Sequence, residues 1–184
     1  MNHADHVDFL RAGVPGSSGQ WADLGSGAGA FTLALADLIG PEGVIYSVDR
    51  DHRALAEQQA IMQKRFRSLE VHCVTADFTR PLALPPMDGV VMANSLHYHK
   101  QKAPIIQAVR RLLRTGARLI LVEYNVDRGN PWVPYPISYP AWEALASRCG
   151  FAETRQIGTK PSRFLREMYS AVSLNLLPLA RHAD

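Results

Sequence analysis

The sequence predicts an α/β fold built on a doubly wound, mostly parallel sheet of seven strands. Short runs rich in Val, Ile and Leu alternate along the chain with longer runs of helical periodicity. Several of the short runs are continuously apolar, which is typical of strands covered by helices on both faces. The last two strand-like runs are joined by only six residues, "KPSRFL", which cannot hold a crossover helix. These two should form an antiparallel hairpin at the sheet edge.

Each element of this fold corresponds to a particular run of residues. The expected strands cover residues 20–24, 43–49, 69–77, 88–94, 117–125, 151–159 and 166–175. The expected helices cover residues 31–39, 51–66, 102–114 and 141–149. In the third helix, Ile105, Val109 and Leu112 recur on one face, which indicates a helix packed against the sheet.

The length and composition predict one domain spanning residues 1–184. With 184 residues, 47% of them apolar, the chain can bury one sizeable core. Residues 1–17 are expected to form an N-terminal helical lid segment. Residues 126–140 hold four prolines and three aromatics, and they are expected to form a stiff loop on the substrate side. The tail after Asn175 should either pack on the sheet edge or contact a second copy of the chain, which leaves the oligomeric state open.

The composition also excludes several classes of protein. No apolar run approaches the roughly 20 residues that a membrane span needs, and the first residues lack a secretory signal pattern. A cytoplasmic protein without a membrane partner is therefore expected. Cys73 and Cys149 are far apart, so no disulfide framework and no metal site is predicted. The net charge of +3 is spread along the chain, so nucleic acid is a possible partner but not a favoured one.

The stretch "WADLGSGAGAFTLALA" lies at the turn from the first strand into the first expected helix. Ligands of open parallel sheets bind at such turns. Gly25, Gly27 and Gly29 permit a tight turn and let a ligand approach the backbone. The same glycines overlap the pattern of dinucleotide-binding proteins. Asp23, however, would repel a pyrophosphate and attract a ligand with an ammonium or sulfonium charge, so a cationic ligand is favoured.

These residues resemble motif I of the class I S-adenosylmethionine-dependent methyltransferases. The resemblance covers residues from about 18 to 175 and extends to "ADF", "MDGVVMANSLHY" and "LLRTGARLILVEY" in the family's order. It implies a Rossmann-like fold with a reversed seventh strand, S-adenosylmethionine as cofactor and S-adenosylhomocysteine as product. It also implies that Asp49 contacts the ribose hydroxyls, that Asp77 holds the adenine amino group and that Phe78 lies against the adenine ring.

The resemblance and the strand-end positions together give the candidate site residues. The expected cofactor-binding residues are Asp23, Leu24, Gly25, Ser26, Gly27, Gly29, Asp49, Arg50, Asp77, Phe78, Asn94 and Ser95. The catalytic candidates are His97, Tyr98 and Glu123, and the substrate-side candidates are His99, Tyr124, Asn130, Trp132 and Tyr135. His97 comes first among the catalytic candidates because histidine titrates near neutral pH. A general base is needed only when the acceptor carries a proton that must leave.

The predicted function is transfer of a methyl group from S-adenosylmethionine to a small molecule by direct in-line displacement. The residues after the fourth strand, "NSLH", lack the prolines usual in methyltransferases of exocyclic base amines. Three alternatives remain open. They are an RNA methyltransferase, a non-catalytic S-adenosylmethionine-binding protein, and an oxidoreductase of the short-chain type using Tyr98 and Lys102.

Overall fold

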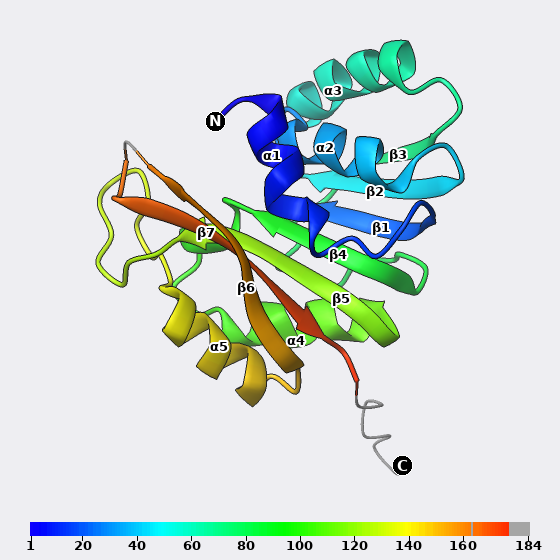
Figure 1. Ribbon diagram of the computed structural model, residues 1–184. Coiled ribbons are helices and arrows are strands. Elements are labelled where there is room, and N and C mark those ends of the chain that lie inside the picture. Colours follow the sequence, from blue (N-terminus) through cyan, green and yellow to red (C-terminus); the bar gives the residue numbers. More distant parts are fainter. Residues whose placement is uncertain (163, 177–184) are drawn as a thin grey trace.

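The computed structural model describes residues 1–162 and 164–176. Seven strands form a single sheet in the order β3-β2-β1-β4-β5-β7-β6 (Figure 1). The strands are β1 (Gly19–Leu24), β2 (Gly43–Asp49), β3 (Glu70–Thr75), β4 (Met87–Ala93), β5 (Leu113–Tyr124), β6 (Ala152–Pro161) and β7 (Glu167–Leu174). Strands β1 to β5 pair in parallel, and β7 is antiparallel to both of its neighbours. The predicted fold class is confirmed.

Helices cover both faces of the sheet. They are α1 (His3–Arg11), α2 (Ala30–Ile39), α3 (His52–Arg65), α4 (Ala103–Leu112) and α5 (Tyr139–Arg148), with a short 3₁₀ turn, η1, at Leu96–Tyr98. Helices α1, α2 and α3 lie on one face, and α4 and α5 lie on the other (Figure 1). The core is accordingly divided into two apolar clusters, one under each group of helices. Double coverage explains why the strands are continuously apolar.

The N-terminal segment forms the expected helix, and this helix is part of the core. Asn2 caps α1 through a capping box with Asp5. Val7, Phe9 and Leu10 are buried against α2 and the sheet. The tail that was expected to pack on the sheet or on a second copy lies, from residue 177 onward, outside the described residues. Within the described part of the chain, no helix has the length and apolar character needed to cross a bilayer.

Two element boundaries differ from the sequence prediction in ways that matter for the site. The third strand ends at Thr75 rather than at residue 77, so Ala76 and Asp77 belong to the loop that follows it. The fifth strand begins at Leu113 rather than at 117, because Leu113 pairs with Met87 of β4. The helical pattern of α4 therefore ends at Leu112, since tertiary pairing overrides local periodicity there.

The carboxyl ends of the parallel strands lie side by side along one edge of the sheet, perpendicular to the outer strands, and the β6–β7 turn reaches this same carboxyl edge. This follows from the register, in which Tyr124, the last residue of β5, pairs with Met168 near the start of β7. The chain leaves β1 toward β2 on one side and has β4 on the other, which makes this edge a topological switch point. Ligands of doubly wound sheets bind at such a point.

Candidate active site

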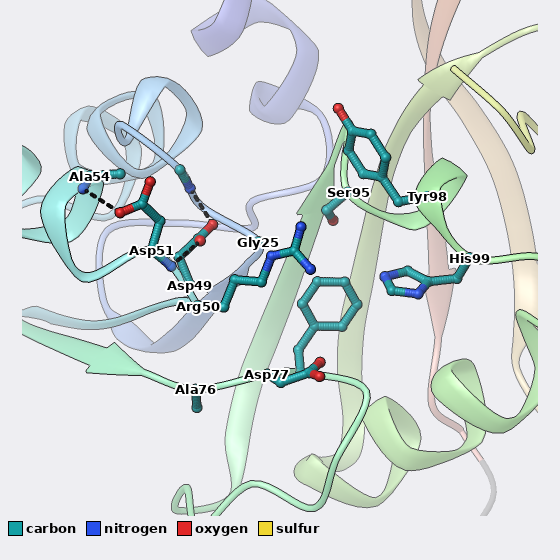
Figure 2. A pocket seen from close by; sticks show the side chains of 12 residues that line it. Gly25, Asp49, Arg50, Asp51, Ala54, Ala76, Asp77, Ser95, Tyr98 and His99 are labelled. Atoms are coloured by element: carbon teal, nitrogen blue, oxygen red, sulfur yellow. Dashed lines mark hydrogen bonds between the residues drawn. The ribbon is translucent and has the colours of Figure 1, made fainter. Parts of the chain in front are cut away.

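A cavity of about 330 Å³ opens at the carboxyl ends of the first four strands (Figure 2). Its size falls in the range of small-molecule and cofactor sites. It is lined by Gly25, Gly27, Asp49, Arg50, Asp51, Ala54, Ala76, Asp77, Phe78, Ser95, Tyr98 and His99. We call it the cofactor pocket. In Figure 2, Asp49 and Asp51 lie on one side of it, and Tyr98 and His99 lie on the other.

The glycine turn shapes one wall of the cofactor pocket. Gly25 has a φ of +79°, and a Cβ there would lie 2.4 Å from the Cβ of Ser95. Gly27 has a φ of +53°, and a Cβ there would meet nothing within 4 Å. Both positions favour glycine because L side chains rarely adopt this backbone conformation. Gly27 therefore borders open space that a ligand can fill, whereas Gly25 makes room for the neighbouring strand end.

Gly29 has a different role from the one expected. A Cβ at this position would lie 2.5 Å from Cγ of Gln58, a fully buried residue of α3. The side-chain oxygen of Gln58 accepts a hydrogen bond from the Ser47 hydroxyl at 2.9 Å. Gln58 thus supports the glycine turn from beneath, and Gly29 permits its close approach. Nothing in the local sequence of α3 indicated this contact.

Asp49 ties the end of β2 to the glycine turn. Its Oδ2 accepts a hydrogen bond from the Gly27 N–H at 2.7 Å, and its Oδ1 accepts one from the Asp51 N–H at 2.9 Å. Asp51, in turn, is the N-cap of α3 and accepts from the Arg53 and Ala54 N–H groups. Asp49 is therefore not the N-cap of α3. Its carboxylate instead holds the glycine turn and the start of α3 together at the wall of the cofactor pocket.

The cofactor pocket favours a cationic ligand at neutral pH. Hydrogen bonds from the Ala54 and Arg53 N–H groups hold the pKa of Asp51 below its ordinary value. Hydrogen bonds from the hydroxyl and N–H of Thr79 do the same for the pKa of Asp77. Burial lowers the pKa of His99, which keeps its imidazole neutral. Among the described residues that line the pocket, Asp49, Asp51 and Asp77 supply three carboxyl groups and Arg50 supplies one guanidinium.

The structure brings together seven of the twelve expected cofactor-binding residues. Those that line the cofactor pocket are Gly25, Gly27, Asp49, Arg50, Asp77, Phe78 and Ser95. Leu24, Ser26, Gly29 and Asn94 lie within two positions of these residues in sequence but do not line the pocket. The pocket also contains Asp51, Ala54 and Ala76, which the sequence analysis missed. The available signal was the position of Asp51 and Ala76 shortly after β2 and β3, whose carboxyl ends face the site, whereas Ala54 lies in the first turn of α3.

Asp23 does not reach the cofactor pocket either. Its side chain is 1% exposed, between the end of β1 and the first turn of α2. Its Oδ2 accepts a hydrogen bond from the Thr32 hydroxyl at 2.6 Å. Burial raises the pKa of Asp23 to about 7, against the lowering effect of the Thr32 bond. If the Asp23 carboxylate attracts a cationic ligand, it must do so through space, from beneath the glycine turn, because it does not contact the pocket.

The first catalytic candidate, His97, is a buried residue that does not line the cofactor pocket. Its ring Nδ1 lies 2.9 Å from Oε2 of Glu123, and its backbone N–H donates to Oε1 of Glu123 at 3.0 Å. His97 and Glu123 are 2% and 0% exposed. Of the three catalytic candidates only Tyr98, next to His97 in η1, reaches the pocket. The buried pair is suited to fixing the position of η1.

Replacing Glu123 with Gln should weaken this anchoring without abolishing the fold. The amide retains an acceptor for the His97 N–H but loses the charge-assisted bond to the ring. We expect a loss of about 1–2 kcal/mol in the free energy of unfolding, measured by denaturant titration. Glu143→Gln, at an exposed position of α5, is the control. Equal stability of the two variants would contradict a structural role for the buried pair.

The substrate-side candidates are dispersed. His99 lines the cofactor pocket, and Tyr124 lines another cavity at the same edge of the sheet. Trp132 and Tyr135 are 71% and 43% exposed and line neither cavity. The side chain of Asn130 accepts hydrogen bonds from the N–H groups of Trp132 and Val133, which stabilises the loop itself.

Lys102 holds this loop against η1. Its ammonium donates to the carbonyl oxygens of His99 at 2.8 Å and of Tyr135 at 2.6 Å. The lysine that the oxidoreductase alternative would pair with Tyr98 is therefore engaged with the backbone. The antiparallel β7 also fits the methyltransferase prediction and not that alternative. Among the described residues, no group of three or more His, Cys, Asp or Glu side chains could hold a metal ion.

Comparison with known proteins agrees with this geometry. A family model described as a methyltransferase domain matches residues 16–163. Release factor glutamine methyltransferase of Thermosynechococcus vestitus is 36% identical over 73 residues, which cover 40% of this chain and 24% of that protein. The chain spans no more than 24% of the length of the curated relatives it matches.

Two solved structures share the fold at low sequence identity. The YcgJ protein of Bacillus subtilis aligns over 96% of this chain and 100% of its own, with a TM-score of 0.76 and 13% identity. Magnesium protoporphyrin IX methyltransferase of Synechocystis, solved with bound S-adenosylmethionine, aligns over 92% of this chain and 77% of its own. Its TM-score is 0.71 and its identity is 20%. At such identities the likeness concerns the fold.

Proposed function

This chain belongs to the methyltransferase domain family, as a class I S-adenosylmethionine-dependent methyltransferase, and from that premise we propose that it methylates a small-molecule acceptor. Its cofactor is S-adenosylmethionine, and S-adenosylhomocysteine is the product. The observation that supports the proposal is the cofactor pocket. Its glycine turn leaves open space beside Gly27, and three carboxyl groups line the same pocket. Such a site suits a ligand with a positive charge and disfavours a pyrophosphate.

The residues of the pocket fit this cofactor. When bound, it supplies a methyl group on a positively charged sulfur, which is already strongly electrophilic. Asp49 would hold the ribose hydroxyls, Asp77 would accept from the adenine amino group, and Phe78 would pack against the adenine. The lowered pKa of Asp77 keeps its carboxylate ionised and able to accept at neutral pH. Gly27 would allow the amino-acid part to approach the backbone.

The chain's own contribution to catalysis is positioning. A direct in-line displacement needs the acceptor atom held opposite the leaving sulfur, and correct placement supplies much of the acceleration. Tyr98 and His99 lie across the cofactor pocket from Asp49 (Figure 2), so they are proposed to border the path by which the acceptor reaches the methyl group. His97 and Glu123 act through η1 as positioning residues rather than on the reacting atoms.

A small molecule is favoured as acceptor over RNA. An RNA substrate requires cationic side chains that contact its phosphates, and among the described residues Arg50 is the one lysine or arginine that lines the cofactor pocket. Magnesium protoporphyrin IX methyltransferase of Synechocystis, which shares the fold, has a small molecule in its name as the acceptor. The acceptor atom, whether O, N, S or C, is not part of this proposal.

Calorimetric titration with S-adenosylmethionine, S-adenosylhomocysteine and NAD tests the cofactor. We expect micromolar binding of the first two and none of NAD. Binding of NAD alone would contradict the proposal. A second assay follows formation of S-adenosylhomocysteine with pools of small molecules or with total RNA. Product formation that requires RNA and falls steeply with salt would indicate an RNA acceptor instead.

A further inference from the structure

A fully buried polar side chain of α3, that of Gln58, lies beneath the glycine turn and does not line the cofactor pocket. Ala54, four residues earlier, lines the pocket near the start of α3 (Figure 2). Residues four apart lie on one face of a helix, so Gln58 occupies the next turn of the face that borders the site. Glutamine is mostly an exposed residue type, so its complete burial here requires an explanation.

The side-chain amide of Gln58 ends a short chain of polar groups that links three elements. Its Oε1 accepts a hydrogen bond from the hydroxyl of Ser47, a fully buried residue of β2, at 2.9 Å. The Oγ of Ser47 lies 2.7 Å from the Oγ of Ser26. Ser26 lies between Gly25 and Gly27 in the glycine turn. The chain of polar groups therefore connects the turn to β2 and α3 from below.

The same side chain packs against the backbone of the turn at Gly29. A Cβ at Gly29 would lie within 2.6 Å of both Cγ and Cδ of Gln58. The N–H of Gly29 donates to the carbonyl oxygen of Ser26 at 2.9 Å, which closes the turn just before α2 begins. Because side chains in a protein interior pack closely, this contact prevents the turn from shifting toward α3.

The turn is held from the pocket side as well. Asp49, which lines the cofactor pocket, accepts a hydrogen bond from the Gly27 N–H at 2.7 Å. A turn so rich in glycine has more backbone freedom than other segments, so its shape depends on such contacts. With Asp49 on one side and Gln58 on the other, the turn is fixed in shape before a ligand arrives, which lowers the entropic cost of binding.

The amide of Gln58 is unfavourable for stability in one respect. Its Nε2 is buried and has no hydrogen-bond partner among the described residues. A buried donor without a partner destabilises the folded state. An apolar side chain of similar size would avoid this cost, and the hydroxyls of Ser47 and Ser26 can still bond each other across 2.7 Å. The stability of the fold therefore does not account for the amide.

We propose that Gln58 is a positioning residue for methyl transfer, which fixes the glycine turn in the shape that receives the cofactor without touching the cofactor itself. The proposal rests on the proposed function of the cofactor pocket. Gln58 acts through its contacts with Ser47 and Gly29. Gly25 and Gly27 belong to the same turn and line the pocket. Loss of the amide should therefore weaken cofactor binding without weakening the fold.

The variant Gln58→Met tests this proposal, because methionine is an unbranched side chain of similar length that has no amide. Calorimetric titration with S-adenosylhomocysteine at pH 6 gives the affinity, and thermal unfolding gives the stability. We expect the affinity to fall about tenfold, since the turn is no longer fixed by the amide. The Tm should equal or exceed that of the unmodified protein, since the unpaired donor is removed.

Two further variants are the controls. Gln58→Glu keeps an acceptor for the Ser47 hydroxyl, and burial should keep its carboxyl group protonated at pH 6, so it should bind as tightly as the unmodified protein. Met62→Ala changes a residue of α3 that is 2% exposed and lies one helical turn beyond Gln58. It should lower the Tm because it leaves a cavity, with the affinity for S-adenosylhomocysteine unchanged.

The outcomes separate a positioning role from a structural one. Equal affinities of Gln58→Met and Gln58→Glu would overturn the proposal, and so would a Tm of Gln58→Met below that of Met62→Ala. An affinity loss in Met62→Ala as large as that in Gln58→Met would also overturn it, because any loosening of α3 would then suffice. Failure of S-adenosylhomocysteine to bind the unmodified protein would overturn the proposed function instead.

Discussion

Replacing Asp23 with Asn is expected to stabilise the protein by about 4 kcal/mol at pH 8. Burial raises the pKa of Asp23 to about 7 from an ordinary value of 3.8, so its ionisation opposes folding. Asn is neutral at every pH and can still accept the hydrogen bond that the Thr32 hydroxyl donates at 2.6 Å. The corresponding rise in Tm is about 10 °C for a chain of this size.

The stabilisation should depend on pH in a defined direction. Below pH 3.8 the carboxyl is protonated in both the folded and the unfolded protein, so Asp23 contributes its full stability and Asn confers no advantage. As the pH rises toward 7, the unfolded chain releases this proton first and the folded state loses stability. The gap between the two proteins therefore widens from about pH 4 to pH 7 and then stays constant.

Thermal unfolding at several pH values between 4 and 8 measures this gap. Asp8→Asn is the control, because Asp8 lies at a solvent-exposed position of α1. If the free-energy difference between Asp23→Asn and the unmodified protein does not widen with pH more than it does for this control, the prediction is contradicted. Asp23 would then ionise in the folded protein without a large loss of stability.

The variant Asp23→Asn also tests whether the Asp23 carboxylate attracts the cofactor, apart from its effect on the stability of the fold. If the carboxylate attracts a cation above the glycine turn, Asp23→Asn should weaken binding of positively charged S-adenosylmethionine more than that of S-adenosylhomocysteine, whose sulfur is neutral. The ratio of the two affinities, measured by calorimetry at pH 8, reports this attraction directly. An unchanged ratio would leave Asp23 without an electrostatic role toward the cofactor.

Replacing Gly27 with Leu is expected to weaken S-adenosylmethionine binding by at least about 100-fold, or about 2.7 kcal/mol. A Cβ at Gly27 meets nothing within 4 Å, so the new side chain can only enter the open space of the cofactor pocket. The variant should still fold, with a loss of about 1–2 kcal/mol from the left-handed backbone conformation. Calorimetric titration gives the affinity, and thermal unfolding gives the stability.

Gly116→Leu is the matched control for this prediction. Gly116 has a φ of +84°, and a Cβ there also meets nothing within 4 Å, but the residue lies in β5 and lines neither cavity. It should therefore show a comparable loss of stability with unchanged cofactor affinity. Comparable affinity losses in the two variants would mean that Gly27 affects binding through the fold and not through the pocket.

The sequence predicted the sheet and most of one site because both depend on local pattern. Continuous apolar runs indicated covered strands, and the short link before β7 indicated the antiparallel hairpin. Asp49 and Asp77 were assigned because the resemblance places an acidic residue at the end of the second strand and another after the third strand. Asp51 carries no motif, and Ala76 precedes Asp77 in "ADF" without a functional group, so neither was assigned although both line the same pocket.

Residues that depend on long-range contacts could not be placed from the sequence. Histidine chemistry favoured His97 as a base, but its contacts with Glu123, 26 positions later, bury it. Gln58 supports Gly29 from a different helix. Asn94 and Ser95 were assigned together, yet a single left-handed residue directs them to different cavities.

The sequence by itself determined the fold class, the family and the glycine turn with its neighbouring carboxylates. These follow from periodicity and from residues within a few positions of one another. The tertiary structure alone decided which polar side chains remain accessible, because burial depends on elements distant in the chain. It buried Asp23 and His97, and it brought the start of β7 beside the end of β5, where Tyr124 and Met168 line the same cavity.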